Sequence, residues 1–336
     1  MVVDSLFANV TEPASYSTDL SSAVLTPLDQ LTCYEICGKD AQKFLQGQLT
    51  NDVSEISPTR GQLSSYCTPK GRMLAIFYVC QFQDKFLILI RTDIAESVIN
   101  RLKMFVLRAK VEINERPVAW IPFGLTGTPI EPILGELNLT APDNDYEVVY
   151  SKNSLCMKVP GVIPRYLLIG DDAFINRVNN LDTSNVIIYT HSFWQWLDIM
   201  SGIPSVSEAT QESFVPQMAN MELINGVSFS KGCYPGQEIV ARLHYLGNAS
   251  RRMFRIEAPT DQEINPGDDI YQSESDSNQA IGSVVSAIKE NAEKFAGLAI
   301  LRIEAAQQNK ILVGSPTGIP ATIMPLPYEV PTEKKQ

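Results

Sequence analysis

The chain has 336 residues and a formal net charge of −11, with 44% hydrophobic and 19% charged residues. This composition is typical of a folded protein with a sizeable core, and the length allows two or three domains. The acidic balance argues against a broad electrostatic grip on nucleic acid, which needs many lysine and arginine contacts to phosphates. The longest apolar stretch, Leu74 to Cys80, is too short to span a bilayer. The first basic residue is Lys39, so the N-terminal residues lack the positively charged region with which a signal peptide begins. We therefore expect a cytoplasmic protein with no stable nucleic-acid binding and no membrane contact.

The first part of the chain predicts a ferredoxin-like unit. Residues 1–28 are rich in serine and threonine, which predicts a loose leader. Strand patterns then alternate with amphipathic helical patterns, in the order of a split β-α-β unit. The expected strands cover 31–37, 64–68, 73–81 and 85–91, and the expected helices begin at Asp40 and at Thr92 or Asp93 as N-caps.

The second part predicts further strands and helices and then a terminal β-barrel. The stretch 122–142 is rich in proline and glycine, which predicts a boundary or a long loop. Expected strands follow at 147–150, 155–159, 163–169 and 187–189, and expected helices at 171–181 and 192–200. Residues 202–228 form a long polar connection, a kind of loop that usually serves a site. Short strands separated by turns from residue 251 onward indicate an all-β, barrel-like module. The predicted strands of this module cover 251–258, 280–288, 294–302, 310–315 and 318–325.

The segment Phe229 to Arg242, FSKGCYPGQEIVAR, is the most informative part of the sequence. Glycines allow close backbone approach and positive φ, and the amphipathic run from Gln237 predicts a helix. Cys233 would then lie just before a helix N-terminus with Lys231 nearby, and both features favour the thiolate form of a cysteine. The alternative is a cysteine that fills a small apolar space and a lysine that is simply solvated.

The helix expected at 192–200 offers a second constellation. At helical spacing, Trp194 and Asp198 share one face. An indole face suits stacking of a flat heterocycle such as a pterin, and a carboxylate accepts the N–H donors of its amino-pyrimidine edge. The alternative is a tryptophan that packs in the core.

The six cysteines and two histidines suggest no metal centre. The cysteines (33, 37, 67, 80, 156 and 233) show neither a C-x-x-C pair nor a regular disulfide spacing, which suits a reducing compartment. We therefore expect no metal ligands.

Four segments resemble the YgfZ family, the folate-binding relatives of the glycine-cleavage T protein (aminomethyltransferase). They are FLQGQLTNDV (44–53), FWQWLDIMSGIP (193–204), FVPQMANMELINGVSFSKGCYPGQEIVAR (214–242) and LPY (326–328). The resemblance covers most of the chain from about Leu31 to Arg255, and the K-G-C-Y-x-G-Q-E signature at 231–238 is its most specific part.

The resemblance implies an α+β fold like that of the glycine-cleavage T protein, with ferredoxin-like subdomains in a ring around a folate channel and a C-terminal β-barrel. We expect the leader at 1–28, a folate-binding region at 29–250 with two interleaved subdomains (roughly 52–145 and the remainder), the barrel at 251–328 and a tail at 329–336. The cofactor implied is tetrahydrofolate or a derivative. The function implied is support of iron–sulfur enzymes, such as those that thiomethylate tRNA, which would be its protein partners.

Site residues follow from the positions that match the family's motifs. Cys233 takes the place of the functionally required thiol, and Lys231 accompanies it as the second candidate catalytic residue. The residues expected to contact the cofactor are Trp194, Asp198, Tyr234, Gln237, Glu238 and Arg242.

Four residues, at three places in the sequence, depart from the pattern of the family or of its relatives. Leu31 stands where the family has a second tryptophan. Leu74 and Ala75 lie where the aminomethyltransferases carry a catalytic aspartate, which disfavours their chemistry here. Met200 replaces the glutamate that those enzymes use to hold the pterin.

Three functions remain open on the sequence. The first is a folate-binding maintenance factor for iron–sulfur proteins that uses the Cys233 thiol. The second is a folate-dependent one-carbon (aminomethyl) transferase. The third is a scaffold protein with a vestigial folate site and a structural cysteine.

Overall fold

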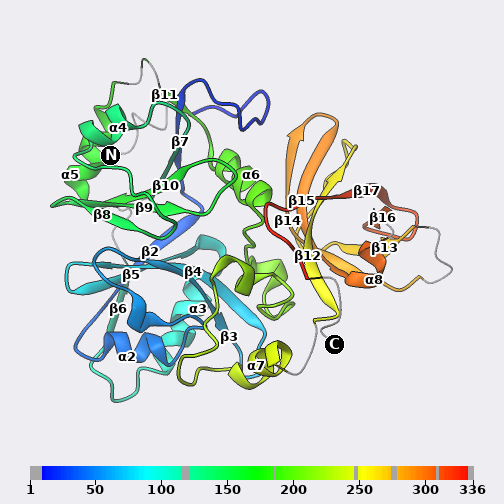
Figure 1. The fold of residues 1–336 in the computed structure, drawn as a ribbon, viewed down its shortest axis with the longest axis horizontal. Helices are drawn as coiled ribbons and strands as arrows, with labels where there is room; N and C mark the ends of the chain where they lie inside the picture. Colours follow the sequence, from blue (N-terminus) through cyan, green and yellow to red (C-terminus); the bar gives the residue numbers. More distant parts are fainter. Residues whose placement is uncertain are drawn as a thin grey trace. The chain divides into compact units, whose positions relative to one another are not determined.

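The computed structural model describes residues 10–115, 122–182, 184, 186–245, 249–273, 278–307 and 310–331. Its contacts divide the chain into two compact units. Unit 1 comprises Met1–Ser64 and Phe77–Trp194, and unit 2 comprises Ser65–Ile76 and Gln195–Gln336. Unit 2 therefore combines the C-terminal part of the chain with Ser65–Ile76, the tip of a hairpin from the first half of the sequence. Figure 1 shows this hairpin between β3 (Gln62–Cys67) and β4 (Met73–Phe82).

Unit 1 contains a six-stranded sheet in the order β11-β1-β7-β10-β9-β8. Its strands are β1 (Ala23–Pro27), β7 (Phe123–Thr126), β8 (Val148–Tyr150), β9 (Ser154–Val159), β10 (Arg165–Gly170) and β11 (Val186–Ile188). Only β1 and β11 pair in parallel among the registers described for this sheet. The helices α4 (Glu131–Glu136) and α5 (Asp172–Asn179) add apolar side chains to one core with β1, β7 and β10.

Two expectations about this sheet need correction. The loose leader expected through residue 28 ends earlier, because Ala23–Pro27 form β1 and all five residues are buried. The stretch 122–142 is not a simple loop, since it holds β7 and α4. Both strands are only four or five residues long, so their patterns are too short to reveal a strand whose stability comes from pairing on both sides. Residues 1–9 of the expected leader lie outside the described part of the chain.

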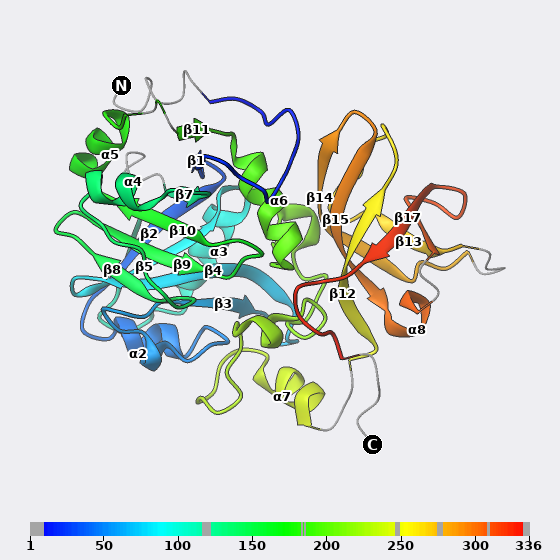
Figure 2. The same ribbon diagram turned by 45° about the horizontal axis from the view of Figure 1, so that its top comes forward.

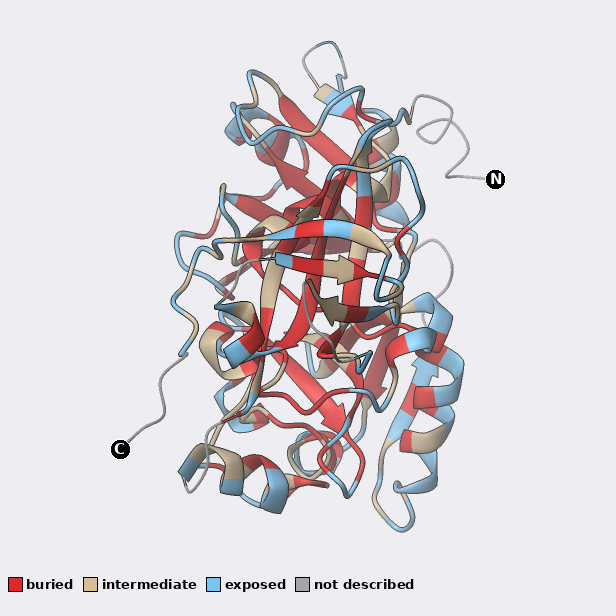
Figure 3. Ribbon diagram, turned by 90° about the vertical axis from the view of Figure 1, so that its right-hand side faces the viewer, coloured by how far each residue is buried: buried red, intermediate tan, exposed pale blue. Residues whose placement is uncertain are grey.

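A second sheet has the strand order β3-β4-β5-β2-β6. Its strands are β2 (Leu31–Cys37), β3 (Gln62–Cys67), β4 (Met73–Phe82), β5 (Lys85–Arg91) and β6 (Glu112–Glu115). The helices α2 (Ala41–Gln46) and α3 (Thr92–Met104) belong to unit 1, whereas the end of β3 and the start of β4 belong to unit 2. Figure 2 labels both helices and the strands β2 to β5. The strands predicted at 31–37 and 85–91 end where the sequence placed them. Figure 3 shows that the buried positions follow the strands, while the helices carry buried and exposed faces.

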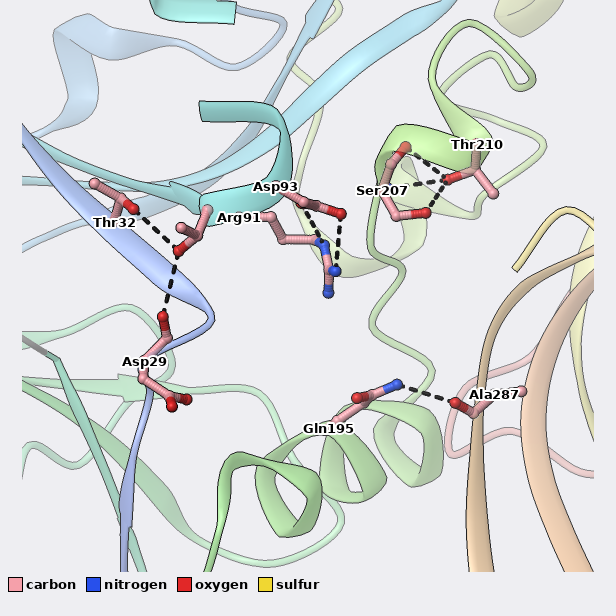
Figure 4. A network of polar contacts seen from close by, with 9 residues as sticks. Asp29, Thr32, Arg91, Asp93, Gln195, Ser207, Thr210 and Ala287 are labelled. Atoms are coloured by element: carbon pink, nitrogen blue, oxygen red, sulfur yellow. Dashed lines mark hydrogen bonds and ion pairs between the residues drawn. The ribbon is translucent and has the colours of Figure 1, made fainter. Parts of the chain in front are cut away.

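The two expected N-caps act differently from a helix cap. The carboxylate of Asp40 accepts a hydrogen bond from the Lys110 amide at 2.8 Å and makes no cap bond to α2. The hydroxyl of Thr92 lies 3.0 Å from that of Thr32 and donates to the Asp29 carbonyl at 3.3 Å (Figure 4). These side chains satisfy backbone groups of neighbouring segments, a use that sequence spacing does not distinguish from capping.

Unit 2 contains the closed barrel β12-β15-β14-β13-β16-β17. Its strands are β12 (Arg251–Ala258), β13 (Asp269–Gln272), β14 (Gly282–Asn291), β15 (Lys294–Arg302), β16 (Lys310–Val313) and β17 (Ile319–Met324). Alternate residues of these strands form one apolar core that includes Ile256, Val284 and Leu301. The barrel predicted from the sequence is thus present, although β13 and the short helix α8 (Ile303–Ala306) were not expected.

In unit 2, the elements that precede the barrel in the sequence lead to the signature segment. The helix α6 (His191–Ser201) enters the unit, and the connection after it contains the short helical turns η3 (Glu208–Thr210) and η4 (Met221–Ile224). The signature then precedes α7 (Gln237–Tyr245).

Two glycines let the hairpin between β3 and β4 lie directly against the start of α7. Gly236 has φ +83°, and a Cβ atom there would come within 2.5 Å of both the Gly71 Cα and the Thr68 carbonyl oxygen. A Cβ on Gly71 would meet Ile239 at 3.0 Å. Only glycine permits this approach, so the contact fixes the base of the signature turn against the hairpin.

We expect Gly236→Ala to destabilise the protein by about 2–4 kcal/mol, because it adds backbone strain at positive φ to a steric clash. Gly232→Ala is the matched control in the same turn, since no atom lies within 4 Å of the added Cβ. Urea unfolding of both variants measures the difference. Equal stability of the two variants would contradict the role of the glycine contact.

The last described residues of unit 2 return to the end of α6. The hydroxyl of Tyr328 donates to the Gly202 carbonyl at 2.7 Å and accepts a hydrogen bond from the side-chain nitrogen of Asn220 at 3.5 Å. Burial is the main cause that raises the pKa of Tyr328 to about 12 from an ordinary value of 10.0. The LPY segment is therefore part of the packed structure and is no free tail.

This pKa shift predicts a loss of stability at alkaline pH. The folded state holds the Tyr328 proton more tightly than the unfolded state, so the contribution is complete below pH 10 and is lost as the pH rises toward about 12. Tyr328→Phe should unfold more easily at pH 8 and should show a smaller further loss between pH 10 and 12. Denaturant titrations at several pH values test this, and parallel pH profiles for the two proteins would refute it.

Candidate functional site

The signature turn presents Cys233 to solvent. Cys233 and Gly232 are both exposed, and the space around Gly232 is open to at least 4 Å from an added Cβ. Three residues later Gly236 packs against the hairpin, and α7 begins at Gln237. The thiol therefore stands at the tip of a turn whose base is held, which is the arrangement predicted from the sequence.

The other cysteines are poor candidates for thiol chemistry. Burial raises the pKa of Cys67 to about 12 and raises the pKa values of Cys80 and Cys156 further, so these three remain protonated near neutral pH. Cys33 is also buried. Cys37 is half-buried, and burial followed by the charge of Glu35 raises its pKa. Among the six cysteines, Cys233 alone is classed as exposed.

Lys231 faces into the turn and away from open solvent. It is only 7% exposed, and its ammonium nitrogen lies 5.2 Å from the ring centroid of Tyr234. Its carbonyl oxygen accepts a hydrogen bond from the Gln237 side chain at 3.3 Å. A cation over an aromatic face is an attractive contact, so Lys231, Tyr234 and Gln237 together close the turn around Cys233.

Tyr234 contributes a buried, uncharged side chain to the turn. Its ring is buried, and burial, followed by the neighbouring Cys67, raises the pKa of its hydroxyl well above the ordinary value. The phenol therefore stays protonated at neutral pH.

Glu238 and Arg242 occupy the outer face of α7. Both side chains are exposed, one helical turn apart. The structure thus separates the predicted cofactor contacts of the signature into two groups. Tyr234 and Gln237 face the turn, whereas Glu238 and Arg242 face solvent.

Aromatic contacts join the beginning of the signature to the end of α7. The rings of Phe229 and His244 stack with their centroids 3.6 Å apart and an interplanar angle of 14°. The hydroxyl of Tyr245 donates to the Phe229 carbonyl at 3.5 Å. These contacts close the loop from Phe229 to Tyr245 on itself, and nothing in the local sequence pattern indicated them.

The predicted pair on α6 is divided between the units. Trp194 belongs to unit 1, where it is 2% exposed, and the guanidinium of Arg165 lies 4.8 Å from the centroid of its ring. A Cβ on Gly124 would come within 2.2 Å of the indole. Asp198, one turn later on the same helix, is half-buried and belongs to unit 2. The open indole face expected from the sequence is instead covered by Arg165, a residue that sequence reasoning did not single out.

The four residues that depart from the expected pattern are all apolar. Leu74 and Ala75 are buried in β4, and the Leu74 carbonyl accepts a hydrogen bond from the Gln211 side chain. The Met200 sulfur lies 3.2 Å from a guanidinium nitrogen of Arg255. Leu31 opens β2.

The long connection at 202–228 supplies structural contacts. Ser207 and Thr210 bond reciprocally around η3, with the Ser207 amide 3.0 Å from the Thr210 hydroxyl (Figure 4). Just before this connection, the Gln195 side chain donates to the Ala287 carbonyl of β14 at 3.0 Å (Figure 4). Further along, the Gln217 side chain donates to the Val240 carbonyl of α7 at 2.5 Å. The connection therefore supports α7, as its length and polarity suggested.

Two kinds of feature were not found in the described ranges. No group of three or more histidine, cysteine, aspartate or glutamate side chains could hold a metal ion there. Likewise, none of the helices within those ranges has both the length and the apolar character needed to cross a membrane.

The fold matches that of a solved aminomethyltransferase. The glycine cleavage system aminomethyltransferase T from Bartonella henselae superposes with a TM-score of 0.74 over 97% of this chain and 89% of its own, at 13% sequence identity. This likeness confirms the fold expected from the sequence. At this identity it extends to the fold alone.

Sequence comparison identifies curated relatives that carry one name. No protein-family model matches the chain. The proteins called "tRNA-modifying protein YgfZ" from Edwardsiella ictaluri and Pectobacterium carotovorum subsp. carotovorum are 30% and 29% identical to it. The first match covers 90% of this chain and 92% of the relative, and the second 95% and 96%. A third, from Colwellia psychrerythraea, is 30% identical over 80% of this chain and 82% of its own length. Identity at this level over nearly the whole length, together with the signature turn, shows that the chain belongs to the YgfZ family.

Proposed function

We propose that the chain supports tRNA modification, as the name of its relatives states for them. The observation that carries the proposal is the Cys233 thiol, which is exposed at the tip of a turn with a fixed base. A thiol that is to react with another molecule must be reachable, and it gains from being held in one place.

The finer proposal is that the protein maintains iron–sulfur enzymes that thiomethylate tRNA, in the cytoplasm, through the chemistry of this thiol. Buried Cys33, Cys67, Cys80 and Cys156 are unsuited to that task. Lys231 lies in the same turn, with its ammonium nitrogen over the Tyr234 ring, and we propose that it accompanies Cys233 in this role.

A tetrahydrofolate derivative is the proposed cofactor, and the polar groups present suit it in part. The Asp198 carboxylate is half-buried and can accept the N–H donors of an amino-pyrimidine ring. Arg165 covers one face of the Trp194 indole, so the expected contact of Trp194 with the cofactor stays a proposal for the titration below. When bound, a reduced folate supplies a ring that can carry a one-carbon unit.

Replacement of Cys233 by alanine tests the thiol. In cells that depend on this protein, Cys233→Ala should abolish its support of thiomethylated tRNA, measured by mass spectrometry of tRNA nucleosides. The thiol is exposed, so the melting temperature should stay within about 2 °C of the parent. Cys37→Ala, which removes a half-buried cysteine of unit 1, is the control and should retain function. Normal thiomethylation with Cys233→Ala would refute the role.

Titration with tetrahydrofolate tests the cofactor. Binding near Trp194 should give a saturable change in tryptophan fluorescence that is lost in Trp194→Phe and retained in Trp196→Phe. Trp196 is a suitable control because its ring nitrogen donates to Glu290, at 2.6 Å, within unit 2. A titration without a saturable change would favour the scaffold function over the folate-dependent one.

The one-carbon transferase is the alternative function, and the residues present do not favour it. Leu74 and Ala75 are buried apolar side chains at the place of the catalytic aspartate, so no group there can exchange a proton with a reacting amine. We expect no turnover of methylene-tetrahydrofolate with a methylamine donor. Measurable turnover would support the transferase.

A further inference from the structure

A buried glutamine forms a hydrogen bond with α7, the helix that follows Cys233. Gln217 is 2% exposed, and its side-chain nitrogen donates to the Val240 carbonyl at 2.5 Å. Val240 is itself fully buried on the inner face of α7. This contact adds a hydrogen bond from outside the helix to a carbonyl in its middle, seven residues after the thiol.

Gln217 is in turn held by the first strand of the barrel. The guanidinium of Arg252 donates to the Gln217 carbonyl at 2.7 Å and also to the Glu222 carboxylate. The side chains of Arg252 and Glu222 are only 10% and 11% exposed. In such surroundings each charge depends on the other, and removal of either leaves an uncompensated buried ion.

A second bond joins the same loop to the next residue of the strand. Asn220, which has φ 58°, donates from its side-chain nitrogen to the Met253 carbonyl at 2.8 Å. The loop from Gln217 to Glu222 is therefore attached to β12 at two consecutive residues. All these groups lie within unit 2.

The position of the thiol depends on attachments of the residues on either side of it. Gly232 and Cys233 are exposed, and the turn is held by the contact of Lys231 with Gln237, by the contact of Gly236 with Gly71 and by the bond to Val240. The bond to Val240 leads through Gln217 to Arg252 of the barrel.

We infer that Gln217, Glu222 and Arg252 are positioning residues for Cys233, and that the barrel serves the thiol by holding α7 through them. The inference rests on the proposed role of Cys233 for its functional meaning. Its physical content is that loss of the Gln217 donor frees α7 and the turn before it without unfolding the barrel.

Gln217→Met is the direct test, because methionine keeps the length of the side chain and removes the donor. A nitroxide label is attached to Cys233 of the purified full chain with a methanethiosulfonate reagent, in a Cys37→Ser background. The electron paramagnetic resonance line shape should show greater mobility of the label in Gln217→Met. Hydrogen exchange of α7 amides should accelerate about three- to tenfold, as expected for the loss of one buried hydrogen bond.

Gln195→Met is the matched control. It removes an equivalent bond from a glutamine side chain to a backbone carbonyl, at Ala287 of β14, and should leave both the line shape and the exchange of α7 unchanged. A parent-like line shape in Gln217→Met would overturn the inference. So would acceleration of exchange that extends equally to β14 and β15, because it would reveal general loss of structure.

Arg252→Lys provides a second variant and a rescue. Lysine keeps a cation beside Glu222, so label mobility should lie nearer to the parent than in Arg252→Met, and tRNA thiomethylation should follow the same order. Equal mobility in the two Arg252 variants would contradict a positioning role for the charge. The spectroscopic results do not depend on what Cys233 does in the cell, whereas unchanged thiomethylation in Cys233→Ala would defeat the proposed function alone.

Discussion

The close approach of two backbone segments at Gly71 and Gly236 is the constraint on which the signature turn depends. With a side chain at Gly236, α7 could not begin against the hairpin, and the turn would have no fixed base. The hairpin tip comes from the first half of the chain and α7 from the second, so this contact also joins distant parts of the sequence within unit 2. Cys233 thereby gains a defined position while remaining exposed.

In the signature turn, different residues provide the packing and the exposed surface. Its buried members, Lys231, Tyr234 and Gly236, alternate with exposed Gly232 and Cys233. The buried lysine is stabilised by the aromatic ring below it, and the tyrosine stays neutral because of its burial. The buried residues of the turn therefore supply its packing, while the Cys233 thiol is exposed to contact with another molecule.

Much of the fold could be predicted from the sequence because long, regular patterns carried it. The strands at 31–37 and 85–91, the helix around Trp194 and the barrel all have periodicities that extend over five or more residues. The prediction failed for β1 and β7, which are short strands whose stability comes from their neighbours in the sheet. It also failed for the cap assigned to Asp40, since a carboxylate can satisfy a distant amide as well as the helix that follows it.

The candidate site was predictable only where a motif was continuous. Cys233 and its turn lie within one segment, so their arrangement followed from glycine and helix signals. Arg165 and Gln217 were missed because each acts across a long sequence separation, on Trp194 and on Val240. The placement of Arg252 on β12 has a practical consequence for domain dissection. A chain cut before the barrel would lose this guanidinium and with it the bonds to the Gln217 carbonyl and to Glu222, so deletion of the barrel would release the loop that contacts α7 even if the barrel bound nothing itself.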